Sequence, residues 1–202
     1  DSISNEDVMH LAISDCVQAV LAAFRDKALE QKVISPDLKI ELPARLKYNN
    51  EEFNVSIRLK GDWTDHLKTE KWSYRIKIED EKTLRGVKSF SIQSPETRHF
   101  LREYIAHKLF EREQVLTTRY DFLPVAINGK YKGIYAFEEH FDKYLIENNR
   151  RREAPILKFN EDDLWKTRIN RKGGDHPFPF YDNATITLFK KNRTFTKANR
   201  FY

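Results

Sequence analysis

Four cationic side chains stand at alternate positions in two stretches of sequence that have the pattern of β-strands. Arg58 and Lys60 alternate with apolar residues in EEFNVSIRLKG, and Arg75 and Lys77 do the same in WSYRIKIED. Successive strand side chains point to opposite faces, so all four cations share one face if the strands pair. Like charges so arranged repel each other unless an anion lies among them. The pattern fits either an anion-binding surface or a solvent-facing sheet with interspersed acids, and both remain open.

Two adjacent carboxylates, Glu138 and Glu139, follow an aromatic stretch in INGKYKGIYAFEEHFDKYL. The residues after this stretch have helical spacing, which places the acids at the start of a helix. The helix macrodipole stabilises negative charge there by about 0.3 to 1 kcal/mol, and this effect accounts for Glu138. Glu139 has two possible roles: the same stabilisation of a helix start, or a carboxylate that serves a binding site.

Other chemistry has little support in the sequence. Asp62, Asp65 and His66 could ligate a metal, but a lone histidine beside acids in a polar turn is usually solvated. The sequence has no G-x-S-x-G motif, and its single cysteine, Cys16, has the setting of a helix interior. The sequence therefore identifies no catalytic residue and no metal ligand.

The composition indicates one globular domain or lobe, because 40% of the 202 residues are hydrophobic. No apolar run approaches the roughly 18 residues of a membrane-spanning helix. The net charge is +5, but residues 164–202 hold nine Lys or Arg against two Asp, so this tail carries +7 and the rest −2. A solvated face explains the tail better than an acidic partner does, and nucleic-acid binding is not favoured.

Hydrophobic periodicity gives the expected order of elements. Residues 4–31 are predicted to form one amphipathic helix capped by Ser4, followed by a hairpin around Asn49-Asn50 and a strand at 72–80. Ser94 as cap and Pro95 at the first position open a second helix. Its apolar stripe consists of Phe100, Leu101, Tyr104, Ile105 and Leu109.

The Asn128-Gly129 pair predicts a second hairpin, because two-residue turns with positive φ at both positions favour this kind of dipeptide. Helical spacing returns at 141–149, and ILKFN at 156–160 has the pattern of a short strand. The expected fold class is α+β, with helices packed on an antiparallel sheet.

Four segments, IRLKGDWTDHLKTEKWSYRIKI, LREYIAHKLF, INGKYKGIYAFEEHFDKYL and ILKFN, resemble the spore coat protein H (CotH) kinase family in order and spacing. The resemblance covers residues 28–160. Its most specific part is the Asn-Gly-x-Tyr-x-Gly-x-Tyr hairpin, followed by Glu139 and the Tyr144-Leu145 pair. Members of the family are atypical, secreted or surface-associated protein kinases that use ATP and a divalent metal. The resemblance implies a fold like the amino-terminal lobe of such a kinase.

In such a lobe a cation on a central strand meets the nucleotide phosphates, and an acid on a neighbouring helix holds that cation. The resemblance assigns the first role to Arg75, with Lys77 as the alternative, and the second to Glu103. The family commonly has a lysine where Arg75 stands, and a planar guanidinium meets phosphate with a different geometry. The strand before Glu139 would offer backbone groups to the base. The implied ATP-binding residues are Lys60, Arg75, Lys77, Glu103, Glu139 and Lys158.

The family places its metal-binding aspartates in a second lobe beyond the matched region, and the sequence has no counterpart of them. Residues 1–35 are interpreted as an amino-terminal helix, 36–163 as the CotH-like lobe, and 164–202 as a basic tail leading to that second lobe. The implied function is binding of ATP with Mg²⁺ or Mn²⁺ for phosphoryl transfer to a protein hydroxyl, without measurable activity in these 202 residues alone. The alternative is a non-catalytic surface or matrix module that binds a partner protein. The resemblance also implies a secreted or cell-surface location.

Overall fold

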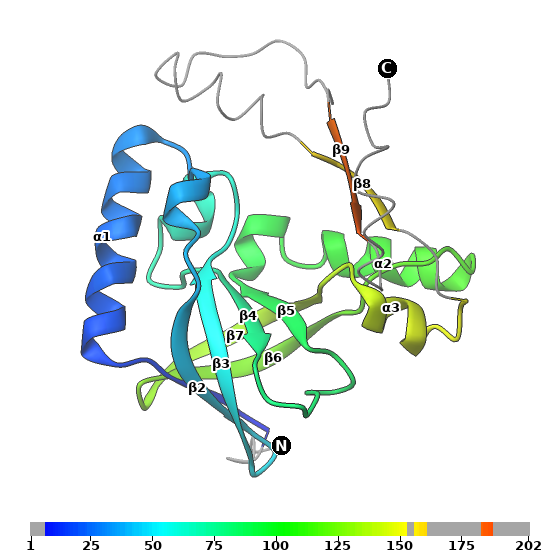
Figure 1. Ribbon diagram of the computed structural model, residues 1–202, viewed down its shortest axis with the longest axis horizontal. Coiled ribbons are helices and arrows are strands. Elements are labelled where there is room, and N and C mark those ends of the chain that lie inside the picture. The colour runs from blue at the N-terminus through cyan, green and yellow to red at the C-terminus, as the bar shows by residue number, and fades with distance from the viewer. Residues whose placement is uncertain (1–6, 153–155, 161–182, 188–202) are drawn as a thin grey trace, which may run out of the picture.

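The computed structural model describes residues 7–152, 156–160 and 183–187, the last two ranges as backbone only (Figure 1). Its helices are α1 (Asp15–Gln31), α2 (Arg102–Arg112) and α3 (Lys143–Asn148), with the 3₁₀ turns η1 (Pro36–Leu38), η2 (Thr64–Leu67) and η3 (Pro95–Arg98). Its strands are β1 (Met9–Ala12), β2 (Leu42–Tyr48), β3 (Glu51–Leu59), β4 (Tyr74–Ile78), β5 (Ser89–Gln93), β6 (Tyr120–Ile127), β7 (Lys130–Glu139), β8 (Ile156–Asn160) and β9 (Asn183–Thr187). None of the helices described is long and apolar enough to cross a membrane.

Strands β1 to β7 close into a barrel in the order β1-β2-β3-β4-β5-β7-β6. Neighbouring strands are antiparallel except at the closure, where β1 runs parallel to β6 with Met9 opposite Val125. This closed barrel overturns the prediction of an α+β fold, a helix-packed antiparallel sheet resembling the amino-terminal lobe of an atypical kinase. Strands β8 and β9 form a separate antiparallel pair.

The closing strand, β1, lies within the segment 4–31, for which the sequence predicts one continuous helix. Met9, Leu11 and Ile13 are buried and alternate with more exposed residues, a period of two that the following helical pattern conceals. Helix α1 begins only after Ser14, whose hydroxyl accepts a hydrogen bond from a backbone N–H of the first turn. The cap therefore lies at Ser14 and not at Ser4, and the residues before it are free to pair as a strand.

A side chain in a turn holds β1 in the barrel. The backbone N–H of Ile13 donates to Asn128 Oδ1 at 2.7 Å, and Asn128 Nδ2 donates to the Ile13 carbonyl at 2.9 Å. The backbone N–H of Asn128 donates to the Leu11 carbonyl at 2.9 Å. Asn128 and Gly129 have φ angles of 49° and 75°, which confirms the predicted hairpin between β6 and β7. We call this set of bonds between Asn128 and the end of β1 the Asn128 clasp.

The other predicted strands are also present. Strands β2 and β3 pair around Asn49 and Asn50, which have φ angles of 50° and 61°. Strand β4 pairs with β3 so that Arg58 lies directly opposite Arg75. Strand β5, which the hydrophobic periodicity does not predict, lies between β4 and β7. The two cation-bearing strands are therefore neighbours, as the sequence predicts.

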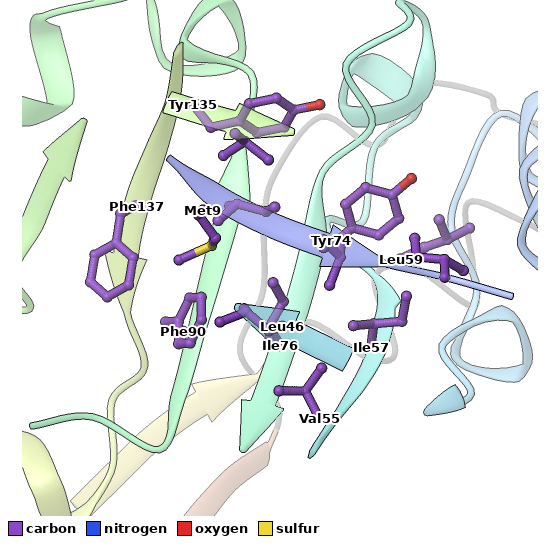
Figure 2. Packing of buried hydrophobic residues seen from close by; sticks show 14 of the residues in the cluster. Met9, Leu46, Val55, Ile57, Leu59, Tyr74, Ile76, Phe90, Tyr135 and Phe137 are labelled. Carbon is purple, nitrogen blue, oxygen red and sulfur yellow. The ribbon is translucent and has the colours of Figure 1, made fainter. Parts of the chain in front are cut away.

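Apolar side chains from alternate strand positions fill the interior of the barrel (Figure 2). The rings of Phe90 and Phe137 stack there with centroids 4.9 Å apart. The labelled residues of this core are Met9, Leu46, Val55, Ile57, Leu59, Tyr74, Ile76, Phe90, Tyr135 and Phe137. Because strand side chains alternate, the polar residues between them lie on the outer surface of the barrel.

The two longer helices pack in different ways. Helix α1 adds Val17, Leu21 and Ala28 to the core. Helix α2 lies on the outer side of β6, where the Tyr104 ring meets the Phe122 ring at a centroid distance of 5.7 Å. These contacts leave most of α2 outside the core.

The start and the buried face of the second predicted helix differ from expectation. Residues Pro95–Arg98 form the short turn η3, the Ser94 hydroxyl makes no capping hydrogen bond, and α2 begins at Arg102. About half or more of the surface is exposed for four residues of the predicted stripe, Phe100, Leu101, Ile105 and Leu109. Tyr104 of that stripe contacts the barrel through the ring of Phe122.

Candidate functional site

The outer face of β3 and β4 borders a pocket of about 360 Å³, which we call the polar pocket. Arg58, Lys60 and Arg75 have the opposite parity to the core residues of their strands, and all three line this pocket. The other lining residues are Lys39, Gly61, Asp62, Trp63, Asp65, His66 and Arg98. The structure thus brings three of the four cations noted in the sequence into one hollow.

Lys60 is held by neighbours from β5 and β7. It is only 8% exposed, its Nζ donates to Gln93 Oε1 at 2.8 Å, and it forms an ion pair with Glu138. Gln93 Nε2 in turn donates to Glu138 Oε2 at 3.4 Å. We call Lys60, Gln93 and Glu138 the Lys60 network. The network fixes the ammonium through a strand carboxylate, whereas the family resemblance implies an acid on a helix for this kind of role.

Arg75 carries a buried donor without a partner. Its Nη1 lies 2.6 Å from His140 Nδ1, but its Nε is buried and makes no hydrogen bond. On the facing strand, Arg58 Nη1 donates to the Leu59 carbonyl at 3.1 Å. A buried N–H without an acceptor is costly, and a charge-assisted bond to an anionic oxygen is the strongest way to satisfy a guanidinium. The donor set of the pocket therefore fits an oxyanion.

Burial and the neighbouring charges together set the ionisation of these groups. Burial lowers the pKa of Arg75 to about 10, and it also lowers the pKa of Lys60. Burial alone would raise the pKa of Glu138, but the attraction of Lys60, Arg75 and Arg98 outweighs it and holds that pKa below its ordinary value. The lining contains five Lys or Arg against two Asp. An anion in the pocket would favour the charged form of every one of these cations.

The three residues considered as metal ligands, Asp62, Asp65 and His66, also line the polar pocket. Asp62 is ion-paired with Lys39, and His66 Nδ1 lies 3.0 Å from Ser73 Oγ. Burial lowers the pKa of His66 to about 4, so the imidazole is neutral at neutral pH. In the part of the chain that the structure describes, no three His, Cys, Asp or Glu side chains gather as a metal site. The divalent metal that the resemblance implies therefore stays an expectation.

Gly61 shapes the wall of the pocket between Lys60 and the 3₁₀ turn η2. Its φ is +103°, and a Cβ at this position would come within 2.1 Å of His66 Cδ2. Only glycine meets both conditions without strain. The close approach of the backbone to His66 thus depends on this residue.

Lys77 and Lys158 complete the predicted set of lysines. Lys77 is exposed, and its Nζ lies 3.1 Å from Glu79 Oε1 on the surface of the barrel. Lys158 belongs to β8, where its backbone pairs with Thr185, and its side chain lies outside the described residues. Lys77 is therefore not part of the polar pocket, and the assignment of Lys158 stays a prediction.

Glu103, predicted to hold Arg75 or Lys77, lies beside a histidine of its own helix. Its Oε1 is 3.7 Å from Nε2 of His107, one helical turn further on. The predicted pairing is wrong because α2 packs on β6, and β5 and β7 separate β6 from β4. Glu138 of β7 pairs with Lys60 instead.

Glu139 is the last residue of β7 and not part of a helical turn. It is 2% exposed, and its carboxylate accepts hydrogen bonds from Arg119 N at 3.1 Å, Arg119 Nε at 3.0 Å and Asn148 Nδ2 at 3.3 Å. We call Arg119, Glu139 and Asn148 the Glu139 network. The backbone N–H groups of Glu139 and His140 donate to the carbonyls of Arg119 and Ser89. These two donors are thus used within the barrel and are not offered to a nucleotide base.

Sequence reasoning missed Glu138, Gln93 and Arg98 as parts of the site. Glu138 pairs across the sheet with Ser91, and Gln93 lies two residues further along the same strand, β5. The alternation of β7 is a signal that could have found Glu138. If the strand pattern is continued through Glu138 and Glu139, the two acids point to opposite faces of the sheet. Arg98 has no such signal, since it belongs to a 3₁₀ turn for which the sequence predicts an α-helix.

The sequence of this chain matches the CotH kinase protein family over residues 57–193, well over half of the chain. The chain belongs to that family. It is also similar to the inner spore coat protein H of Bacillus subtilis (strain 168), with 25% identity over 123 residues. The matched region is 60% of this chain and 33% of the relative, so the chain spans about a third of the length of that protein.

Proposed function

We propose that this chain is the nucleotide-binding part of a CotH-type protein kinase and that the polar pocket receives the phosphate groups of ATP. The observation that carries the proposal is the buried Lys60 ammonium, which is paired with Glu138. Lys60 shares one small hollow with Arg58, Arg75 and Arg98. Phosphoryl transfer depends mainly on positioning and on stabilisation of negative charge, and such a cluster serves both needs.

Each cation has a distinct part in the proposal. Lys60 supplies a compact charge whose position is fixed by the Lys60 network. Arg58 and Arg75 face each other across β3 and β4, and their planar forks suit paired contacts with phosphate oxygens. ATP, when bound, supplies the γ-phosphoryl group for transfer to a protein hydroxyl. We propose the transfer itself for a full-length protein, since the chain spans only part of its relative.

Nucleotide binding by the chain tests the pocket directly. We expect ATP to bind in isothermal titration calorimetry and adenosine to bind far more weakly, with ATP affinity falling as salt is added. Arg75→Gln should lower ATP affinity by roughly 10-fold or more, because it removes a hydrogen bond between charged groups. Lys77→Met, on the same strand but outside the pocket, is the matched control and should leave affinity unchanged. Equal losses in both variants would contradict the proposed site.

Phosphoryl transfer needs a separate assay. The chain is incubated with radiolabelled ATP beside a full-length CotH-family protein, with Mg²⁺ and Mn²⁺ supplied in separate reactions. We expect label in protein only with the full-length enzyme. Autophosphorylation by the chain alone, abolished by Asp162→Ala or Asp163→Ala, would show that the catalytic centre lies within these 202 residues.

A non-catalytic binding module is the second candidate, and one surface favours it. Ile105 and Leu109 of α2 are exposed apolar residues, and the exposed residues Phe100 and Leu101 line a hollow of about 430 Å³ together with Phe122. Exposed apolar patches of this kind commonly mark protein contacts. The combined change Ile105→Asn and Leu109→Asn separates the two functions, because it should abolish partner binding by a module and leave ATP binding intact.

We also infer a spore-coat or surface location. The support is the name of the Bacillus subtilis relative, an inner spore coat protein, at 25% identity. Immunogold labelling of cells that produce the natural protein tests this location. Label confined to the interior of vegetative cells would contradict it.

A further inference from the structure

A second hollow lies on the outer surface of β1, β2 and β3, and we call it the β2 hollow. Its volume is about 650 Å³, within the roughly 300 to 1,000 Å³ found for small-molecule sites. His10 and Ala12 of β1 pair with Lys47 and Arg45 of β2, and all four residues line the hollow. They alternate with the core residues of these strands, so they share the outer face. Of the described residues that line the β2 hollow, none lines the polar pocket.

The two cations of the β2 hollow, Arg45 and Lys47, have no partner among the described residues. Both are exposed, and in this part of the chain no ion pair or side-chain hydrogen bond joins either of them to a neighbour. Glu52 of β3 lies opposite Lys47, but the two side chains form no ion pair in the described structure. Glu52 is also the only acid among the described lining residues. The β2 hollow therefore has an excess of positive charge, with two cations against one acid.

The spacing of these two cations fits an extended chain. Side chains two residues apart on a strand are separated by roughly 6.5 to 7 Å, and an extended peptide repeats its own same-face side chains at this interval. Carboxylates at alternate positions of a peptide can therefore meet Arg45 and Lys47 together. The small side chain of Ala12, opposite Arg45, leaves room beside them. We propose that the β2 hollow binds an extended acidic segment of a partner protein, and this inference does not depend on the proposed nucleotide-binding function.

The test uses two fluorescein-labelled peptides of the same composition and charge, measured by fluorescence anisotropy. In one peptide glutamate and threonine alternate, and in the other all glutamates precede all threonines. The alternating peptide places its carboxylates on one face when extended, as the site requires. An exposed ion pair is worth roughly 2- to 5-fold in affinity. We expect the alternating peptide to bind more tightly by this factor, and both peptides to bind more weakly as salt is added.

Variants of the chain locate the binding surface. Arg45→Gln combined with Lys47→Gln removes both ion pairs and should lower the affinity for the alternating peptide by roughly 4- to 25-fold. Lys130→Gln combined with Lys132→Gln is the matched control, because it makes the same change in charge at the same spacing on β7, outside the hollow. This control should change affinity less than about 2-fold. Ala12→Phe keeps both cations but fills the hollow, and it should weaken the peptide as well. Thermal melts check that each variant is folded.

Inorganic tripolyphosphate, a probe of the polar pocket, separates the two sites. At constant ionic strength, saturating tripolyphosphate should leave the peptide bound, and displacement would place the peptide in the polar pocket and contradict the inference. Equal affinities for the two peptides, or equal losses in the two double variants, would show attraction by net charge alone and would also overturn it. The inference is wrong as well if the wild-type chain binds neither peptide. A chain that binds the peptide as expected but not tripolyphosphate would contradict the nucleotide site only.

Discussion

Glu138 and Glu139 are neighbours in sequence, yet they belong to two regions with opposite character. Glu138 joins the Lys60 network, and Lys60 opens onto the polar pocket, where cations outnumber acids. Glu139 joins the Glu139 network, where its side chain is 1% exposed and Arg119 and Asn148 bind both carboxylate oxygens. The alternation of β7 separates them, because consecutive side chains of a strand point to opposite faces.

The difference between these two regions lies in how completely each carboxylate is satisfied. The Glu139 network is closed in the sense that its carboxylate is fully used. It accepts hydrogen bonds from the side chain and the backbone N–H of Arg119 and from the side chain of Asn148. The Lys60 network borders the polar pocket, whose lining has an excess of positive charge, and Arg75 nearby keeps an unpaired buried Nε. A closed network stabilises the fold, whereas a network beside unbalanced positive charge is suited to a site for an anion.

The largest expected effect is on stability and belongs to the Glu139 network. Glu139→Gln removes a charge that Arg119 and Asn148 surround, and we expect the free energy of unfolding to fall by about 3 kcal/mol. Tripolyphosphate affinity of the folded protein should change less than about 2-fold. Urea denaturation and calorimetry measure the two quantities. A large loss of affinity with normal stability would reverse the roles we assign to the two networks.

The second effect is on ligand binding and belongs to the Lys60 network. Lys60→Met combined with Glu138→Gln replaces a buried ion pair by groups of similar volume, which is often close to neutral for stability. We expect the free energy of unfolding to change by less than about 1.5 kcal/mol. Tripolyphosphate affinity should fall by roughly 10-fold or more. Thermal melts provide the folding control. Unchanged affinity would show that Lys60 is only a structural cation.

The third effect is a pH dependence. Lys60 and Arg75 have pKa values below their ordinary ones, so they lose their charge earlier as pH rises than surface cations do. Anion affinity should be full near neutral pH and should fall as the pH rises towards about 10. Glu138 raises the pKa of Lys60, so Glu138→Gln should move this loss to lower pH. Titrations across the range in wild type and variant measure the shift, and identical profiles would contradict the coupling.

The smallest effect concerns the third carboxylate, Glu103. Its contact with His107 is long and its side chain is 38% exposed, so Glu103→Gln should cost no more than about 0.5 kcal/mol. Tripolyphosphate affinity should not change. A loss of affinity comparable to that of the Lys60 variant would restore Glu103 to the site, against the geometry described above.

Local patterns predicted much of the barrel wall. The alternation in β3 and β4 gave the shared face of Arg58 and Arg75, and the Asn-Gly turn gave the β6–β7 hairpin. These features depend on residues close in sequence. Closure of the barrel depends on residues far apart in sequence, because β1 is four residues long and pairs with segments far along the chain. A short strand beside a strong helical pattern carries too little periodicity to be separated from it.

The candidate site was also predictable only where it depends on residues close in sequence. Cations on one strand face were visible, but the partner of Lys60 lies 78 residues away on β7. Choosing between Glu103 and Glu138 required the strand order, in which β7 lies next to β5 and α2 packs on β6. Charged residues at strand ends are placed by register, and register is set by the whole barrel.

The Asn128 clasp has a consequence for the order of events during synthesis. It joins residues 115 positions apart, so β1 emerges from the ribosome long before the turn that secures it. At roughly 5 to 20 residues per second, the wait is on the order of ten seconds. During this interval β1 can pair with β2, but its other edge stays open and available to a foreign strand. Chaperone occupancy of nascent chains should therefore drop once the β6–β7 hairpin has cleared the exit tunnel.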